Sequence, residues 1–167
     1  GSTLFSEVNF WGLATLTRPH GGYYHTLARL AALLGQLLPF RYVPHFYVAC
    51  SYLLLLFIAG YPFSRRFSFP NSTRFLLGLG VVVTTANNEV FMNLSNWAFL
   101  VPLLWLLLAI SEEPTGAGQT AFDYALLVLV SLSSPFPVCL WPVFVLRYAL
   151  RRTRHSAGLL VGSLLCA

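Results

Sequence analysis

The chain has no lysine and few acidic residues. All ten basic residues are arginine, five residues are acidic, and the charged share is only 9%, whereas a soluble domain carries about 25%. Hydrophobic residues make up 57% of the chain. This composition excludes an ordinary soluble domain and indicates a membrane protein. The net charge of +5 therefore bears on membrane topology, and the sequence offers no basic soluble face for nucleic acid.

Several motifs that carry chemistry are also missing. There is no glycine-rich phosphate loop, no nucleophile elbow and no zinc signature. The cysteines lie in apolar runs without ligand spacing, which predicts buried thiols. Spacings of five and twenty place no two of His20, His25 and His45 on one helical face, so they do not form a metal triad.

Apolar runs predict an all-α fold, a polytopic transmembrane helical bundle with an N-terminal interfacial amphipathic helix. Connecting loops of about ten residues or fewer make consecutive helices antiparallel neighbours. Several runs are shorter than the ~20 residues of a straight span, so they must borrow residues from their flanks or lie among longer neighbours. The candidate spans lie near 44–63, 75–92, 97–110, 121–134 and 136–150, and a sixth begins near 157 and is cut off.

Residues 1–43 are mixed in character and fit no span, so we expect an extracytoplasmic segment ahead of a transmembrane bundle at 44–167. Between Tyr24 and Leu38 the apolar residues recur every three or four positions, which predicts an amphipathic helix in the interface that ends at Pro39. The apolar stripe comprises Leu27, Leu30, Ala31, Leu34 and Leu38, and the polar residues off it are His25, Arg29 and Gln36.

The arginines predict the orientation. If residues 1–43 lie outside, seven of the ten arginines fall in cytoplasmic loops, as the positive-inside rule requires. The segment 86–96 and the turn Ser133–Pro137 then lie outside as well, on the same face as residues 1–43. The seven are Arg65, Arg66, Arg74, Arg147, Arg151, Arg152 and Arg154.

The stretch 86–97 concentrates amides and a carboxylate between two apolar runs. On a helix, its polar spacings place Glu89, Asn93, Asn96 and Trp97 on one face, with Asn88 nearby. A carboxylate near hydrocarbon normally faces a cavity or protein interior and marks a functional site. The alternative is a helix N-terminus at the membrane surface, where the amides act as caps and Glu89 complements the helix dipole.

The N-terminal segment carries a second group of candidates. Glu7 is an acid that could serve as a general base or hold a divalent cation beside a phosphate; alternatively it is a solvated loop residue. Arg18, His25 and Arg29 suit a lipid phosphate at the lip of the bilayer. Ordinary attraction of an interfacial helix to anionic headgroups accounts for them equally well.

The order of three motifs resembles bacterial polytopic inner-membrane proteins of the GT-C glycosyltransferase type, a group with many uncharacterised members. The motifs are Gly22-Tyr-Tyr-His25 followed by Arg29, then Glu89-Val-Phe-Met-Asn93 through Trp97, then Leu132-Ser-Ser-Pro-Phe-Pro137 before the arginine-rich end. The resemblance implies a transferase that takes a sugar from a polyprenyl-phosphate donor on the periplasmic face. Enzymes of this type have more spans, so we expect the chain to be a portion of a longer protein or a reduced relative.

The resemblance also implies residue roles. Glu7 matches an acidic position in the first outer loop and would activate the acceptor hydroxyl as the catalytic base, although the family pattern often has paired acids there. Arg18, His25 and Arg29 would hold the lipid-linked phosphate. Residues of the polar stretch would hydrogen-bond sugar hydroxyls, and Trp97 would form an aromatic wall on which the sugar stacks. The hydrogen-bonding residues are Asn88, Glu89, Asn93 and Asn96.

The alternative function is a non-catalytic integral membrane subunit or scaffold in a larger membrane complex. Its polar motifs would join helices or bind a membrane-protein partner. A transporter ranks last, because polar groups lie mostly at the edges of the spans. In every case the expected surroundings are membrane lipids of a bacterial inner membrane.

Overall fold

The computed structural model describes residues 2–20, 22–85 and 94–165. Every regular element in these ranges is a helix, which confirms the all-α prediction. Extended pairing there is limited to an isolated antiparallel bridge between His20 and Tyr23.

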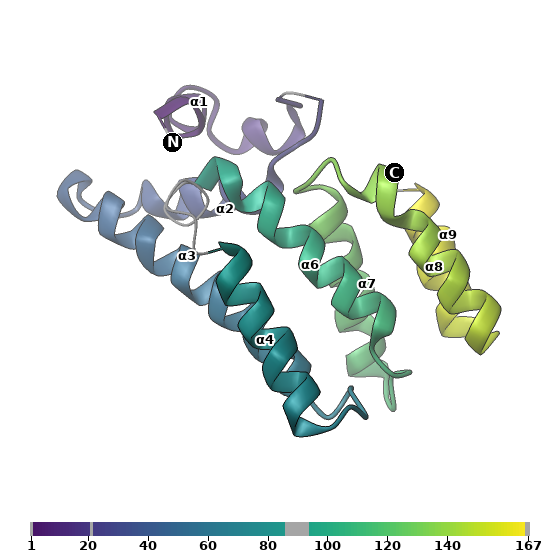
Figure 1. The fold of residues 1–167 in the computed structure, drawn as a ribbon. Coiled ribbons are helices and arrows are strands. Elements are labelled where there is room, and N and C mark those ends of the chain that lie inside the picture. The colour runs from purple at the N-terminus through teal and green to yellow at the C-terminus, as the bar shows by residue number, and fades with distance from the viewer. Residues whose placement is uncertain (1, 21, 86–93, 166–167) are drawn as a thin grey trace.

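The helices α3, α4 and α6 to α9 run alternately up and down the molecule (Figure 1). α3 packs against α4, α6 packs against α7 and α8, and α9 packs against α7 and α8. α1 and η1 lie across one end and contact α2. The elements are α1 (Ser2–Trp11), η1 (Gly12–Thr17), α2 (Thr26–Gly35), η2 (Phe40–Tyr42), α3 (Val43–Gly60), η3 (Tyr61–Phe63), α4 (Asn71–Thr85), η4 (Leu94–Asn96), α6 (Trp97–Ile110), α7 (Ala117–Ser131), α8 (Pro137–Arg151) and α9 (Arg154–Leu165).

A helix coincides with each candidate span where the structure describes it. Within the described ranges, one continuous helical stretch, Phe40–Phe63, is long and apolar enough to cross a membrane, with 24 residues and a mean hydropathy of 1.8. α6 is apolar but has only 14 residues, about 21 Å at 1.5 Å per residue. The structure therefore confirms helices at these positions.

Aromatic and aliphatic side chains fill the centre of the molecule. Trp105 of α6 meets Phe144 of α8 with ring centroids 5.3 Å apart in an edge-to-face arrangement. Leu108 and Leu159 are fully buried beside them in the same cluster. Cys139 is exposed, so the prediction of buried thiols is wrong for that residue, because its side of α8 faces outward.

Small residues allow close helix contacts. At Gly78 of α4 an added Cβ would lie 2.8 Å from the Ala59 carbonyl oxygen of α3, closer than real Cβ contacts allow. At Gly35 of α2 it would lie 2.9 Å from the Tyr47 ring. Glycine at these positions therefore sets how closely α3 approaches its two neighbours.

The predicted amphipathic helix corresponds to α2, but its faces are used differently from the simple pattern. The buried face holds Ala28, Ala31, Ala32 and Gly35 together with Arg29. Leu30, Leu34 and Leu38 of the predicted stripe are exposed. Small side chains let α2 approach the rest of the protein, and the leucines point away from it.

Candidate functional site

Glu7, His20 and Arg29 form an ionic cluster at the end of the molecule where α1 lies. Arg29 Nη2 donates to Glu7 Oε2 at 2.7 Å, and His20 Nδ1 lies 2.9 Å from Glu7 Oε1. The Glu7 carboxylate thus uses one oxygen for each basic partner. α1 supplies the acid and α2 supplies the arginine, so the cluster joins two helices through residues that lie 22 positions apart in the chain.

Arg29 is the buried centre of this cluster. Its side chain is only 1% exposed, and its Nη1 donates to the carbonyl oxygens of Thr15 and Arg18. Its Nε has no acceptor among the described residues. The Glu7 carboxylate and the two carbonyl oxygens offset the cost of burying the Arg29 charge, because an unpaired charge away from water is costly.

An open cavity of about 320 Å³ adjoins the cluster and is lined by Glu7, Trp11, Arg18, Pro19 and Arg29. The Arg18 guanidinium lies over the Trp11 ring, 3.5 Å from its centroid, in a cation–π contact. Arg18 is exposed, and no described acid forms an ion pair with it. The cavity therefore presents one available cation, one carboxylate and one aromatic wall to a ligand.

His25 lies beside the cluster but does not line the cavity. It precedes α2 in a left-handed conformation with a φ of 53°, and its ring stacks on Tyr23 with centroids 3.9 Å apart. Its side chain is buried. Burial, aided by the nearby His20 and Arg29, lowers the pKa of His25 to about 4. His25 is accordingly neutral at pH 7 and not a cation for a phosphate.

Segments far apart in the chain meet at this same end (Figure 1). The Thr26 N–H donates to the Leu132 carbonyl at 3.2 Å, and the Leu27 N–H donates to Ser133 Oγ at 3.0 Å. Ser134 Oγ donates to the Ala98 carbonyl at 2.8 Å. The turn after α7 therefore links the start of α2 to the start of α6, which brings together the described parts of the three predicted outer segments.

The polar stretch is only partly described. Asn88, Glu89 and Asn93 lie outside the described residues. Asn96 ends η4. Trp97 begins α6, is 4% exposed, and donates its indole N–H to Ser51 Oγ at 2.9 Å. This geometry packs Trp97 against α3 and gives it no open ring face for stacking.

The cluster does not fit a divalent cation. Among the described residues, no group of three or more His, Cys, Asp or Glu side chains could hold a metal ion. Glu7 contributes a single carboxylate, which already contacts Arg29 and His20. Hard cations require several oxygen ligands, and the described residues around Glu7 do not supply them.

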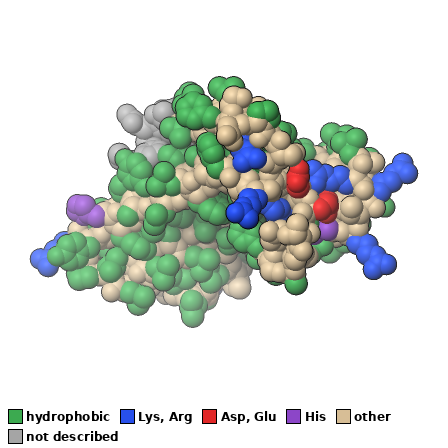
Figure 2. Space-filling view, turned by 90° about the horizontal axis from the view of Figure 1, so that it is seen from below, with side chains coloured by type: hydrophobic (Ala, Val, Ile, Leu, Met, Phe, Trp, Pro, Cys, Tyr) green, Lys and Arg blue, Asp and Glu red, His purple; other side chains and the backbone are tan. Residues whose placement is uncertain are grey.

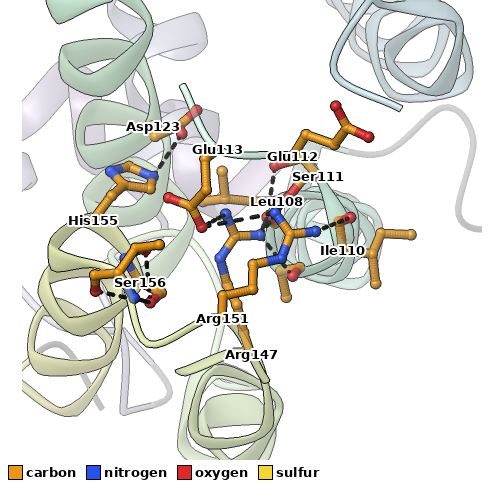
Figure 3. A network of polar contacts seen from close by, with 12 residues as sticks. Leu108, Ile110, Ser111, Glu112, Glu113, Asp123, Arg147, Arg151, His155 and Ser156 are labelled. Carbon is orange, nitrogen blue, oxygen red and sulfur yellow. Dashed lines mark hydrogen bonds and ion pairs between the residues drawn. The ribbon is translucent and has the colours of Figure 1, made fainter. Parts of the chain in front are cut away.

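A second polar network, not anticipated from the sequence, joins the end of α6 to α7, α8 and α9 (Figure 3), at the end of the molecule opposite α1 (Figure 1). Arg66 Nη1 and Nη2 donate to the two oxygens of Asp123 at 2.7 and 2.8 Å, and Asp123 is fully buried. His155 Nε2 lies 2.9 Å from Asp123 Oδ2. Burial lowers the pKa of His155, and Asp123 opposes that shift.

Arg147 belongs to the same network and caps α6. Its Nη1 donates to the carbonyl oxygens of Ala109 and Ser111 at 2.8 and 2.6 Å, and its Nη2 donates to Glu113 at 3.0 Å. The sequence pattern of these arginines predicts membrane topology and gives no sign of this pairing. The lone Asp123 in an apolar run was the available signal for the buried network, since an intramembrane acid normally has a basic partner.

No protein-family model, curated protein or solved structure matches this chain. The family resemblance therefore stays a proposal, and the geometry of the two networks carries the functional argument.

Proposed function

We propose that the chain is a multi-span integral protein of the bacterial inner membrane. The support is its outward surface: large apolar side chains are exposed along several helices, such as Leu53 and Leu56 of α3 and Phe75 and Leu76 of α4. Apolar surface of this extent is costly in water and inexpensive in lipid. Membrane fractions should retain the protein after alkaline carbonate washing, and its release would contradict the proposal.

The proposed orientation places residues 1–43 outside the cytoplasm. The arginines support it. Arg65 and Arg66 belong to the loop between η3 and α4, and Arg147 and Arg151 to the last turns of α8; this loop and this helix end lie at the end of the molecule opposite α1 (Figure 1). Two matched variants test this in a cysteine-free background: Thr17→Cys at the Glu7 end and Thr115→Cys at the other end, both exposed. An impermeant thiol reagent added to whole cells should label Thr17→Cys alone. Labelling of Thr115→Cys alone would reverse the orientation.

We further propose that the cavity beside Glu7 binds a polyprenyl-phosphate-linked sugar for transfer to an acceptor. The single observation that carries this proposal is the convergence of Glu7, the exposed Arg18 and the buried Arg29 on one open cavity. Arg18 would donate to the phosphate, because its guanidinium forks match phosphate oxygens. Glu7 retains lone pairs beyond those directed at Arg29 and His20 and would accept the acceptor's proton.

Binding and transfer can be tested separately in the full-length protein. Arg18→Gln should weaken binding of a long-chain polyprenyl monophosphate, measured by native mass spectrometry, by about tenfold. Arg41→Gln is the matched control, because Arg41 is exposed and does not line the cavity. Glu7→Gln should lower sugar transfer by about 10²-fold or more while leaving phosphate binding in place. Unchanged transfer in Glu7→Gln refutes the assigned base.

A non-catalytic subunit or scaffold is the second candidate. It is favoured by the pairing of Arg29, whose contacts with Glu7, Thr15 and Arg18 resemble a structural lock between α1 and α2. In that case Glu7→Gln should lower the melting temperature, and neither the native protein nor Arg18→Gln should bind polyprenyl monophosphate. Binding by the native protein that Arg18→Gln loses would exclude this candidate.

A further inference from the structure

A second cavity lies at the arginine-rich end, far from Glu7. Its volume is about 280 Å³, and it lies between the loop that follows η3, the C-terminal end of α6 and one face of α8. Its wall is apolar and includes Phe69, Ile110, Val143, Leu146 and Leu150. The exposed fractions of Leu146 and Leu150 are 58% and 76%, so the protein itself leaves much of this wall uncovered.

Two arginines of α8 line the same cavity, one turn apart. Arg151 is held loosely: its Nη1 lies 3.7 Å from Glu113, and its Nη2 donates to the Ile110 carbonyl at a long 3.4 Å. Its side chain is 31% exposed. Contacts of this length leave most of its donor capacity available to a ligand.

Arg147 adds a second positive charge behind Arg151. Its side chain is 1% exposed, and its terminal nitrogens already donate to carbonyl oxygens and to Glu113. Its Nε has no acceptor among the described residues but also has almost no exposed surface. A ligand in the cavity would therefore be attracted by the charge of Arg147 and would not be bound by its N–H groups.

The charge around this cavity favours an anion. Two arginines and one acid, Glu112, line the cavity. Glu113 is not a lining residue, and it forms ion pairs with Arg147 and Arg151. Exposed arginines surround them on the same end, and Figure 2 views the molecule from that end. These additional arginines are Arg65, Arg152 and Arg154.

We propose that this cavity binds an anionic phospholipid, with its phosphate at Arg151, in front of the buried charge of Arg147, and an acyl chain along Leu146 and Leu150. An apolar wall next to a basic mouth matches a molecule with a phosphate and a hydrocarbon tail, and basic pockets between helices on the cytoplasmic side bind such headgroups. The inference rests on the membrane location proposed above but not on sugar transfer. It assigns the site to the cytoplasmic leaflet.

Native mass spectrometry of the full-length protein in detergent can test the site. Phosphatidylglycerol should bind more tightly than phosphatidylcholine with the same acyl chains. Arg151→Gln should weaken phosphatidylglycerol binding by about tenfold, the loss expected for a charged hydrogen bond. Arg154→Gln removes the same charge from an exposed position that does not line the cavity, and it should change binding by less than about threefold.

Three outcomes would overturn the proposal. Equal binding of the two lipids would exclude recognition of the phosphate's charge. Equal losses of phosphatidylglycerol binding in Arg151→Gln and Arg154→Gln would mean that the arginine-rich end attracts anionic lipid in general and that the cavity is not a specific site. Displacement of the lipid by glycerol phosphate at similar concentration would identify a site for soluble anions. Melting temperatures of both variants verify that folding is unchanged, and failure of sugar transfer in any variant would leave these results intact.

Discussion

Arg66 and Asp123 lie 57 residues apart in the chain and form a buried two-pronged ion pair, with donor–acceptor distances of 2.7 and 2.8 Å. Arg66 also donates to the Glu112 carbonyl, and the Glu112 N–H donates back to the Arg66 carbonyl at 2.8 Å. The pair thus joins the loop before α4 to α7 and to the end of α6. The pair lies at the end of the molecule opposite Glu7, so it stabilises the fold without contacting the proposed reaction site.

Asp123→Asn should destabilise the protein strongly. The substitution leaves the Arg66 guanidinium buried without its counter-charge, and breaking a buried pair in this way costs about 3–5 kcal/mol. Glu112→Gln is the control, because Glu112 is exposed; it should change stability by no more than about 0.5 kcal/mol. Reversible unfolding in mixed micelles measures both. Similar stability of the two variants would contradict a structural role for the Arg66–Asp123 pair.

Two glycines of α4 provide a matched test of helix packing. Gly78→Ala places a Cβ 2.8 Å from the Ala59 carbonyl oxygen and should destabilise the protein by about 1–3 kcal/mol. Gly80→Ala meets nothing within 4 Å and should be neutral or stabilise the helix by up to about 1 kcal/mol. The same unfolding assay compares them. A tolerated alanine at position 78 would mean that α3 and α4 are not packed this closely.

The low pKa of His25 predicts a pH dependence of stability. Its folded-state pKa is about 4, below the ordinary value of 6.5, so between these values the unfolded chain binds the extra proton. The contribution of neutral His25 to the free energy of unfolding is therefore fully present above pH 6.5. It is lost as the pH falls toward 4, by at most about 1.4 kcal/mol per pH unit.

His25→Asn tests this dependence, since asparagine tolerates the left-handed conformation at this position. The variant should show a shallower loss of melting temperature between pH 6.5 and pH 4 than the native protein. His45→Asn, at an exposed position, should keep the native slope. An unaltered slope in His25→Asn would assign the acid sensitivity to another group.

A double-mutant cycle can measure the Glu7–Arg29 contact. Arg29 is 1% exposed and Glu7 27% exposed, so Glu7→Gln and Arg29→Gln should couple by about 1–2 kcal/mol. The comparison cycle pairs Glu7→Gln with His20→Gln. His20 is 47% exposed, and its coupling should stay below about 1 kcal/mol because water screens the contact. Equal coupling energies in the two cycles would contradict the interpretation that Arg29 is the main partner of Glu7.

The sequence by itself determined the helices and their order. Apolar runs separated by proline-, glycine- and serine-containing turns predict where α3, α4 and α6 to α9 lie, because burial of apolar surface and backbone hydrogen bonding act on local patterns. The alternation of spans, together with the distribution of arginines, also predicted that Ser133 and residues 1–43 would lie on the same face. The sequence likewise marked Glu7, Arg18 and Arg29 as members of one polar group, which the structure gathers around one cavity.

Tertiary structure alone decided which polar groups are paired. Arg29 looks like a solvent-facing residue of an amphipathic helix, yet carbonyls of η1 and the Glu7 carboxylate surround it. Asp123 looks like an isolated acid until Arg66 and His155 reach it from other elements. Such pairings depend on side chains brought together from distant positions, because the cost of burying a charge is offset only when all of its partners are in place.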